Sequence, residues 1–204
     1  RVFDHSVLHR MAAVSSVPVV NMLSDFAHPL QAVADVLTMQ QNLGELSGKT
    51  VTYVGDFNNV ARSLCEASAM LGMHIRLGCP EGYDAQDNEL LGLTELGAAS
   101  VEQYRDIAIA VTGAHAVHTD TWTSMGQESE SAEREAVFTG FEVTNEIMSL
   151  ADSKAIFMHC LPAHRGQEVS APVIDGPQSK IYQQAHNRMH AARGVLAFLM
   201  GAQQ

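Results

Sequence analysis

The chain has 204 residues and a formal net charge of −11 at pH 7, and no stretch of it is rich in Lys or Arg. Nucleic-acid binding is therefore excluded, because a protein that grips a phosphate backbone needs a basic surface. Hydrophobic residues make up 46% and charged residues 17% of the chain, which is typical of a globular protein that buries a core. No apolar run approaches the ~20 residues that span a bilayer, so we expect no membrane association.

The cysteines and the start of the chain indicate the compartment. Cys65, Cys79 and Cys160 are odd in number, widely spaced and without a CxxC pair. This pattern argues against a disulfide framework and a zinc site, and it favours a reducing cytoplasm. The first ten residues, RVFDHSVLHR, have neither the apolar core of a signal peptide nor the Arg and Ser bias of a transit peptide. The first residue is Arg rather than Met, so we expect either a processed chain or a piece of a longer one.

Short apolar runs alternate with longer amphipathic ones, which predicts an α/β fold with a mainly parallel sheet. The expected strands are Pro18–Val20, Thr50–Val54, His74–Leu77, Ala116–Thr119 and Ala155–His159. The expected helices are Gln31–Gln41, Asn59–Leu71, Glu102–Gly113, Glu142–Leu150 and Asn187–Met200. The type of element over Glu81–Gly97 stays open. The acidic run Gln127–Glu135 is interpreted as a solvated helix face or a mobile loop.

Three polar segments directly follow predicted strands: GDFNNV from residue 55, DTWTSMGQE from residue 120 and CLPAHRG from residue 160. Ligands of an open parallel sheet bind outside the carboxyl ends of its strands, so these segments are expected to converge on one crevice. In the first segment, Gly55 allows a tight turn, and one of Asn58 and Asn59 is expected to cap the next helix while the other meets a ligand. The segment lacks the third glycine of a dinucleotide-binding fingerprint.

The other two segments carry a carboxylate and a thiol. Asp120, with Ser124 and Met125 in the same loop, suits an ammonium ligand, although an Asp that caps its own turn is an equal alternative. Cys160 is a nucleophile, a ligand-positioning group or a small buried hydrophobe, and no His and acid spacing favours covalent catalysis.

A fourth cluster lies at the start of an expected helix. Pro29 fits the first helical turn, and His28 and Gln31 project from that turn on neighbouring faces. Free backbone N–H groups at a helix start favour an anion, so this pair suits a carbonyl or a phosphate. For an isolated His, a purely structural role is the alternative, and no partner at metal-ligand spacing is present.

Taken together, the motifs identify a family. HPLQ at residues 28–31, DTWTSMGQE at 120–128, HCLPAHRG at 159–166 and NR at 187–188 occur in this order along nearly the whole chain. The chain resembles the ornithine carbamoyltransferases of the aspartate/ornithine carbamoyltransferase family. The SMG and HCLP motifs are typical of the ornithine branch.

The resemblance implies transfer of a carbamoyl group from carbamoyl phosphate to the δ-amine of L-ornithine, giving L-citrulline and phosphate, with no metal or organic cofactor. The implied carbamoyl phosphate site is Arg1, His28, Gln31, Cys160, Leu161 and Arg188. The implied L-ornithine site is Asn59, Asp120, Ser124 and Met125. Of these residues, Cys160, His28 and Arg188 are the expected catalytic ones. Family members are commonly homotrimers, so a homotrimer is implied as well.

The resemblance also implies a domain organisation. Residues 1–22 would end a carbamoyl-phosphate-binding domain, residues 23–185 would form a Rossmann-like, doubly wound ornithine-binding domain, and residues 186–204 would form a helix returning to the first domain. The family's main phosphate motif, Ser-x-Arg-Thr, is absent from the sequence, so we expect a C-terminal portion that is inactive alone. His186 stands where the family has Glu.

Two alternatives remain at this stage. One is a carbamoyltransferase that acts on putrescine or an acylated ornithine, and the other is a non-catalytic ornithine-binding module. The residues on the carbamoyl phosphate side, Arg1, His28, Gln31 and Arg188, favour the enzyme, because a pure binding module gains nothing from them. The sequence leaves the biosynthetic or catabolic direction open.

Overall fold

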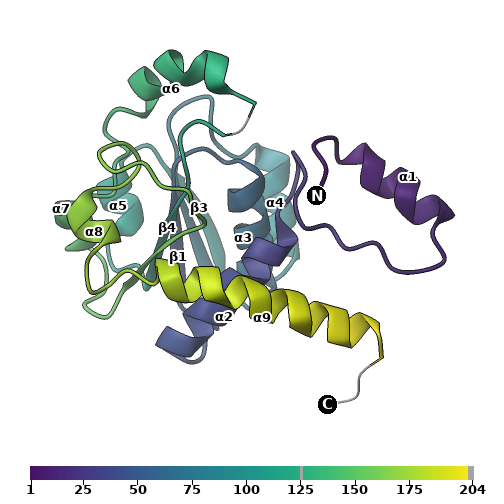
Figure 1. Ribbon diagram of the computed structural model, residues 1–204. Coiled ribbons are helices and arrows are strands. Elements are labelled where there is room, and N and C mark those ends of the chain that lie inside the picture. The colour runs from purple at the N-terminus through teal and green to yellow at the C-terminus, as the bar shows by residue number, and fades with distance from the viewer. Residues whose placement is uncertain (125, 202–204) are drawn as a thin grey trace.

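The computed structural model describes residues 1–124 and 126–201, and a parallel five-stranded sheet forms its centre (Figure 1). The strands are β1 (Thr50–Val54), β2 (His74–Gly78), β3 (Ser100–Tyr104), β4 (Ala116–Thr119) and β5 (Ile156–His159). Their order across the sheet is β3-β2-β1-β4-β5. The strand order reverses between β1 and β4, and ligands of such sheets bind at the carboxyl ends beside this point. The predicted doubly wound α/β fold is confirmed.

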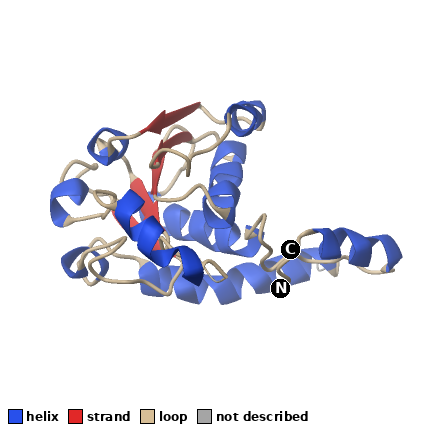
Figure 2. Cartoon of the chain, turned by 90° about the horizontal axis from the view of Figure 1, so that it is seen from above, coloured by secondary structure: helices blue, strands red, loops and turns tan. Residues whose placement is uncertain are grey.

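Helices cover both faces of the sheet. They are α1 (Ser6–Val14), α2 (Pro29–Leu43), α3 (Asn59–Met70), α4 (Asp87–Glu95), α5 (Ile107–Val111), α6 (Ser131–Phe138), α7 (Asn145–Met148), α8 (Ala171–Ile174) and α9 (Ile181–Leu199), with a short 3₁₀ turn η1 (Glu128–Glu130). Helix α1 and the C-terminal part of α9 project from the body on the same side (Figures 1 and 2). Among the described residues, no helix combines the length and the apolar character needed to cross a membrane.

The two faces of the sheet bury two separate apolar cores. Leu64 of α3 and Ile75 of β2 belong to the first core, which also takes in residues of α2. Val117 of β4 and Phe157 of β5 belong to the second, with residues of α5, α7 and α8. Because both faces are covered, the central strands β1 and β4 are buried at every position, and so is the edge strand β5.

Four of the five strand predictions are confirmed. Thr50–Val54 and Ala116–Thr119 match exactly, and β2 and β5 match the predicted ranges within one residue. Pro18–Val20 is not a strand. Ser100–Tyr104 is an edge strand, whereas the sequence predicted a helix from Glu102. Its SVEQY sequence is partly exposed and polar, so it lacks the apolar signal of a buried strand.

Three helical segments also differ from the prediction. Helix α1 was not expected, and it has no buried residue. Helix α4 occupies the part of the chain whose element type was left open. The acidic run Gln127–Glu135 contains η1 and the start of α6, and Arg134 within it is buried, so the interpretation as a solvated face is wrong for that residue.

Helix α2 buries polar side chains where periodicity pointed to apolar ones. Val33 is exposed, whereas Gln31, Asp35 and Thr38 are buried. The Asp35 carboxylate accepts hydrogen bonds from Gln31 Nε2 and from Gln184 Nε2 of α9, each at 2.7 Å. These bonds satisfy polar groups that would otherwise be costly to bury, so α9 docks on α2 through hydrogen bonds as well as apolar contact.

The hydrogen bonds between α2 and α9 predict that removal of the Asp35 carboxylate strongly lowers the free energy of unfolding. In Asp35→Ala, two buried amide donors lose their acceptor, at ~1–3 kcal/mol each, so the free energy of unfolding should fall by about 2–5 kcal/mol. Urea denaturation followed by circular dichroism measures the change. Asp175→Ala, which removes an exposed ion pair with Arg165, is the control and should leave stability within error of the parent chain. Equal stability of the two variants would contradict the role of Asp35.

Candidate active site

The segments that follow β1, β4 and β5 meet at one open cavity of about 1230 Å³. Each segment contributes a residue to the lining of this cavity: Asn58, Asp120 and Cys160. This is the convergence that the strand topology predicted. His28 at the start of α2 and Arg188 of α9 line the same cavity. A carboxylate and a thiol thus face a cavity that basic side chains enter from other elements.

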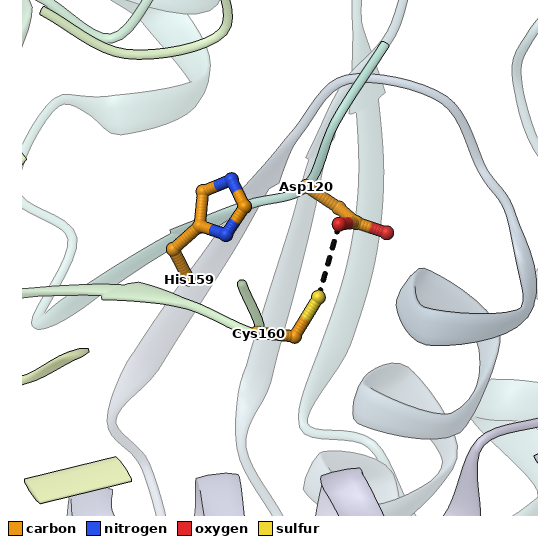
Figure 3. Close-up of side chains that lie close together, drawn as sticks. All are labelled: Asp120, His159 and Cys160. Atoms are coloured by element: carbon orange, nitrogen blue, oxygen red, sulfur yellow. Dashed lines mark hydrogen bonds between the residues drawn. The ribbon is translucent and has the colours of Figure 1, made fainter. Parts of the chain in front are cut away.

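Asp120 is the centre of the hydrogen bonding at the strand ends. Its side chain is 8% exposed and accepts bonds from Cys160 Sγ at 2.9 Å, from Asn58 Nδ2 at 3.0 Å and from the backbone N–H of Thr121 at 2.8 Å. Figure 3 shows the Cys160 thiol directed at the Asp120 carboxylate. These three donors fix the carboxylate at the mouth of the sheet. The Thr121 bond is the turn contact that was one alternative for Asp120, and the ligand role stays a prediction.

The Cys160 thiol is held in its protonated form. Burial raises its pKa well above the usual range, and the negative charge and hydrogen bond of Asp120 raise it further. A thiol is a weak nucleophile, because the thiolate is the reactive form. Cys160 is therefore a hydrogen-bond donor that positions Asp120 rather than an attacking group.

His159 is bound on both sides of its ring. Its Nδ1 accepts the backbone N–H of Leu161 at 2.9 Å, so the proton lies on Nε2, which faces Glu168 Oε1 at 3.1 Å. Glu168 is fully buried, and its Oε1 also accepts the backbone N–H of His164. The His159–Glu168 pair thereby holds the polypeptide that follows Cys160.

Asp120, His159 and Cys160 each offer a potential metal ligand within 4.8 Å of the others. The set fits a metal poorly. The Nδ1 lone pair of His159 accepts the Leu161 amide, and its other nitrogen carries the proton shared with Glu168. A metal would also need the Cys160 thiolate, whose formation the Asp120 charge opposes.

The basic side of the cavity is built where α2 and α9 meet. Arg188 Nη1 donates to Gln31 Oε1 at 2.6 Å, and the Gln31 amide is turned this way because its Nε2 donates to Asp35. The backbone N–H of His28 donates to Ser63 Oγ at 2.8 Å. Burial and the nearby Arg188 charge lower the pKa of His28 to about 4. At neutral pH His28 therefore presents a neutral imidazole.

The structure brings most of the predicted site residues to this cavity. Its lining includes Arg1, His28, Asn59, Asp120, Ser124, Cys160, Leu161 and Arg188. Gln31 lies behind the lining, 1% exposed and bound to Arg188. Met125 falls outside the described residues. Asn58 is the cap of α3, accepting from the N–H groups of Val60 and Ala61, while Asn59 Nδ2 donates to the Ser24 carbonyl at 2.7 Å.

Several supporting residues were missed by sequence reasoning. Either Asn58 or Asn59 was expected to cap the helix, and Asn58 does so while also donating to Asp120, a contact that was not expected. The sequence around three of them looks like that of ordinary polar residues in helices and loops: Asp35, Gln184 and Glu168. Arg134 lies in an acidic run. A weak signal was available for Asp35, because Gln31 and Asp35 are four residues apart and so share one helix face.

Comparisons with known proteins identify the family. The Asp/Orn-binding domain of aspartate/ornithine carbamoyltransferases matches residues 47–199, and the carbamoyl-P-binding domain of the same family matches residues 1–41. The chain belongs to this family. Its predicted resemblance is confirmed.

The most similar relatives include ornithine carbamoyltransferases from distant organisms. The one from Hyperthermus butylicus is 49% identical over 98% of this chain and 65% of its own length, and the one from Symbiobacterium thermophilum is 47% identical over 98% and 66%. The solved ornithine carbamoyltransferase from Pyrococcus furiosus is 44% identical, with a TM-score of 0.92, over all of this chain and 66% of that one. The chain thus spans about two thirds of the length of these carbamoyltransferases.

The Cys160–Asp120 pair predicts low thiol reactivity in this carbamoyltransferase-family chain. Cys160 should react with iodoacetamide at pH 7.5 at least about tenfold more slowly than a free cysteine, because each unit of pKa changes the thiolate fraction tenfold. Asp120→Asn should speed the reaction, since the carboxylate raises the thiol pKa. Mass spectrometry of the Cys160 peptide measures the rate. An unchanged or slower rate in Asp120→Asn would contradict the assignment.

His28 predicts a pH dependence of stability. Its pKa is about 4 in the folded chain and near 6.5 when unfolded, so between these values only the unfolded chain binds the proton. The contribution of His28 to stability is complete above pH 6.5 and is lost as the pH falls toward 4. His28→Asn should remove this loss, about 2–3 kcal/mol at pH 4.5. Urea denaturation at pH 7 and 4.5 measures it, with His9→Asn on the exposed face of α1 as control, and equal losses in parent and His28→Asn would refute it.

Proposed function

We propose that the protein to which this chain belongs transfers the carbamoyl group of carbamoyl phosphate to the δ-amine of L-ornithine, giving L-citrulline and phosphate. The observation that carries the proposal is the division of the cavity into an acidic side at Asp120 and a basic side at Arg188 and Arg1. An amino-acid acceptor and an anionic donor need these opposite charges on one cavity. The family membership and the names of the relatives support the same reaction.

On the acceptor side, Asp120 is the counter-charge for the α-ammonium of L-ornithine, and Asn59 and Ser124 stand beside it in the lining. Met125 belongs to the same proposed set. Asp120 suits this role because Cys160, Asn58 and the Thr121 amide already hold the carboxylate in place. A binding group fixed in advance loses little entropy when the ligand arrives.

On the donor side, Arg188 and Arg1 bind the phosphate, and His28 donates its imidazole N–H to the carbonyl oxygen. A neutral imidazole is suited to this, because it has one N–H donor at neutral pH. The Gln31 oxygen, aimed by Asp35, accepts from the carbamoyl NH₂ as it does from Arg188. Cys160 and the Leu161 backbone lie where the donor and acceptor sides meet.

The chemistry needs no covalent intermediate on the protein. The neutral δ-amine attacks the carbonyl carbon, and a new C–N bond forms as the carbonyl oxygen gains negative charge. His28 stabilises this oxyanion. The C–O bond to phosphate then breaks, phosphate leaves with its electron pair toward Arg188, and the amine nitrogen loses its proton to the departing phosphate. Holding both reactants in one cavity supplies much of the rate enhancement.

Two further properties belong to this proposal. The whole protein is a cytoplasmic homotrimer, in keeping with the family resemblance and with three free cysteines. The 204-residue chain alone makes citrulline at a negligible rate, because the Ser-x-Arg-Thr phosphate motif is not in its sequence. Citrulline formation by the purified chain at an enzyme-like rate would contradict the second statement.

Asp120→Asn tests the acceptor assignment. The substitution keeps the shape of the side chain but removes its charge, so the affinity for L-ornithine should fall at least about tenfold, in the range expected when one partner of a charge pair is lost. Isothermal titration of L-ornithine into the chain measures it, with Asp175→Asn as the control.

Competing acceptors are distinguished in the same titrations. Putrescine keeps both amines of L-ornithine but lacks the α-carboxylate, and N-acetylornithine lacks the α-ammonium charge, so both should bind more weakly than L-ornithine to the parent chain. Tighter binding of putrescine or N-acetylornithine would replace the proposed substrate. Binding of L-ornithine that Asp120→Asn leaves unchanged would place the acceptor elsewhere.

A further inference from the structure

Arg134 is a buried arginine that lies close to the cavity without lining it. It belongs to α6, its side chain is 4% exposed, and three elements surround it. The guanidinium lies 4.7 Å from the ring centroid of Tyr83 and 5.5 Å from that of Phe138. Burying a charge costs free energy unless the charge is paired and hydrogen-bonded, so the burial of Arg134 has to be explained by the partners that it binds.

Arg134 Nη1 lies 3.6 Å from the exposed Glu130 carboxylate of η1, and two further polar contacts of Arg134 go to the two segments that build the acceptor side. Its Nε donates to the Trp122 carbonyl at 2.5 Å, and its Nη2 forms an ion pair with Asp56. Trp122 belongs to residues 120–124, here named the acceptor loop, which carries Asp120 and Ser124. Asp56 belongs to the turn after β1, two residues before Asn58, and lines the cavity.

The acceptor loop and the β1 turn are thereby joined at two places. Inside, at the strand ends, Asn58 Nδ2 bonds Asp120. Outside, Arg134 joins the Trp122 carbonyl to Asp56. Two attachments along a short loop fix its direction, whereas one would leave it free to pivot about Asp120.

Arg134 also settles the charge of the cavity. Asp25, Asp56 and Asp120 contribute the carboxylates of its lining. The Arg134 guanidinium pairs with Asp56, so of the two carboxylates in the segments after β1 and β4 it is Asp120 that we assign to the α-ammonium of an α-amino acid.

We propose that Arg134 is a positioning residue for L-ornithine: it holds the acceptor loop against the β1 turn and neutralises Asp56. This inference rests on the proposed function for the identity of the ligand, whereas the anchoring of the loop is independent of it. Arg134 acts through Trp122 and Asp56 and does not touch the substrate.

Trp122 provides a direct measurement, because it is the only tryptophan of the chain. It is 7% exposed and packs against Phe138 with ring centroids 5.8 Å apart. In Arg134→Met, which keeps the length of the side chain but removes the charge and donors, the emission of Trp122 should shift to the red and acrylamide quenching should increase. The affinity for L-ornithine should fall about tenfold in the same variant.

Arg105→Met is the matched control. Arg105 also joins a backbone carbonyl, that of Cys79, to a carboxylate, that of Asp84, but none of these residues lines the cavity. It should leave Trp122 emission and L-ornithine affinity unchanged. Arg134→Lys keeps the charge but loses the fork that reaches two acceptors, and it should fall between the parent and Arg134→Met in both measurements. If circular dichroism shows that Arg134→Met does not fold, Arg134→Lys takes its place as the test variant.

The outcomes separate this inference from the proposed function. If folded Arg134 variants keep the emission, the quenching and the L-ornithine affinity of the parent, the positioning role is refuted. If Arg105→Met lowers the affinity as much as Arg134→Met, the effect is general destabilisation and the role is likewise refuted. If Trp122 becomes accessible in the Arg134 variants but the parent chain does not bind L-ornithine, the loop anchor stands and the proposed acceptor is wrong.

Discussion

The buried Asp35 carboxylate is the interaction on which the site most depends. It is fully buried, and its two amide partners, Gln31 and Gln184, come from α2 and α9. Gln184 also accepts the backbone N–H of His159 at the end of β5. One carboxylate therefore sets the position of both helices and of the strand that leads to Cys160. One carboxylate oxygen, Oδ1, accepts both amides and so sets their orientation, whereas an apolar residue would fix distance but no amide orientation.

The acidic and the basic residues of the cavity are carried by different structural elements. The acidic side comes from loops after β1 and β4, whereas Arg188 is carried by α9. The chain as a whole is acidic, with 23 Asp and Glu against 12 Lys and Arg, so the basic side is a local feature. Low-dielectric walls strengthen such a local field, which allows few arginines to bind an anion on an acidic protein.

The sequence predicted the elements that are buried on both sides and the residues that occur in motifs. Thr50–Val54 and Ala116–Thr119 are exact because their apolar runs have no other stable environment. Ser100–Tyr104 was missed because SVEQY is partly exposed and carries little apolar signal. Asp35 and Arg134 were missed for a different reason: their roles depend on partners that only the tertiary fold brings near.

The contact between Arg188 and Gln31 joins residues 157 positions apart in the sequence. Closing so long a loop has an entropic cost that local helix formation does not repay. During synthesis, the strands and the acceptor loop leave the ribosome well before α9 does. A nascent chain already carries Arg1 and the loop that holds Asp120 while Arg188 is still to be made, so the cavity acquires the Arg188 charge only when α9 docks.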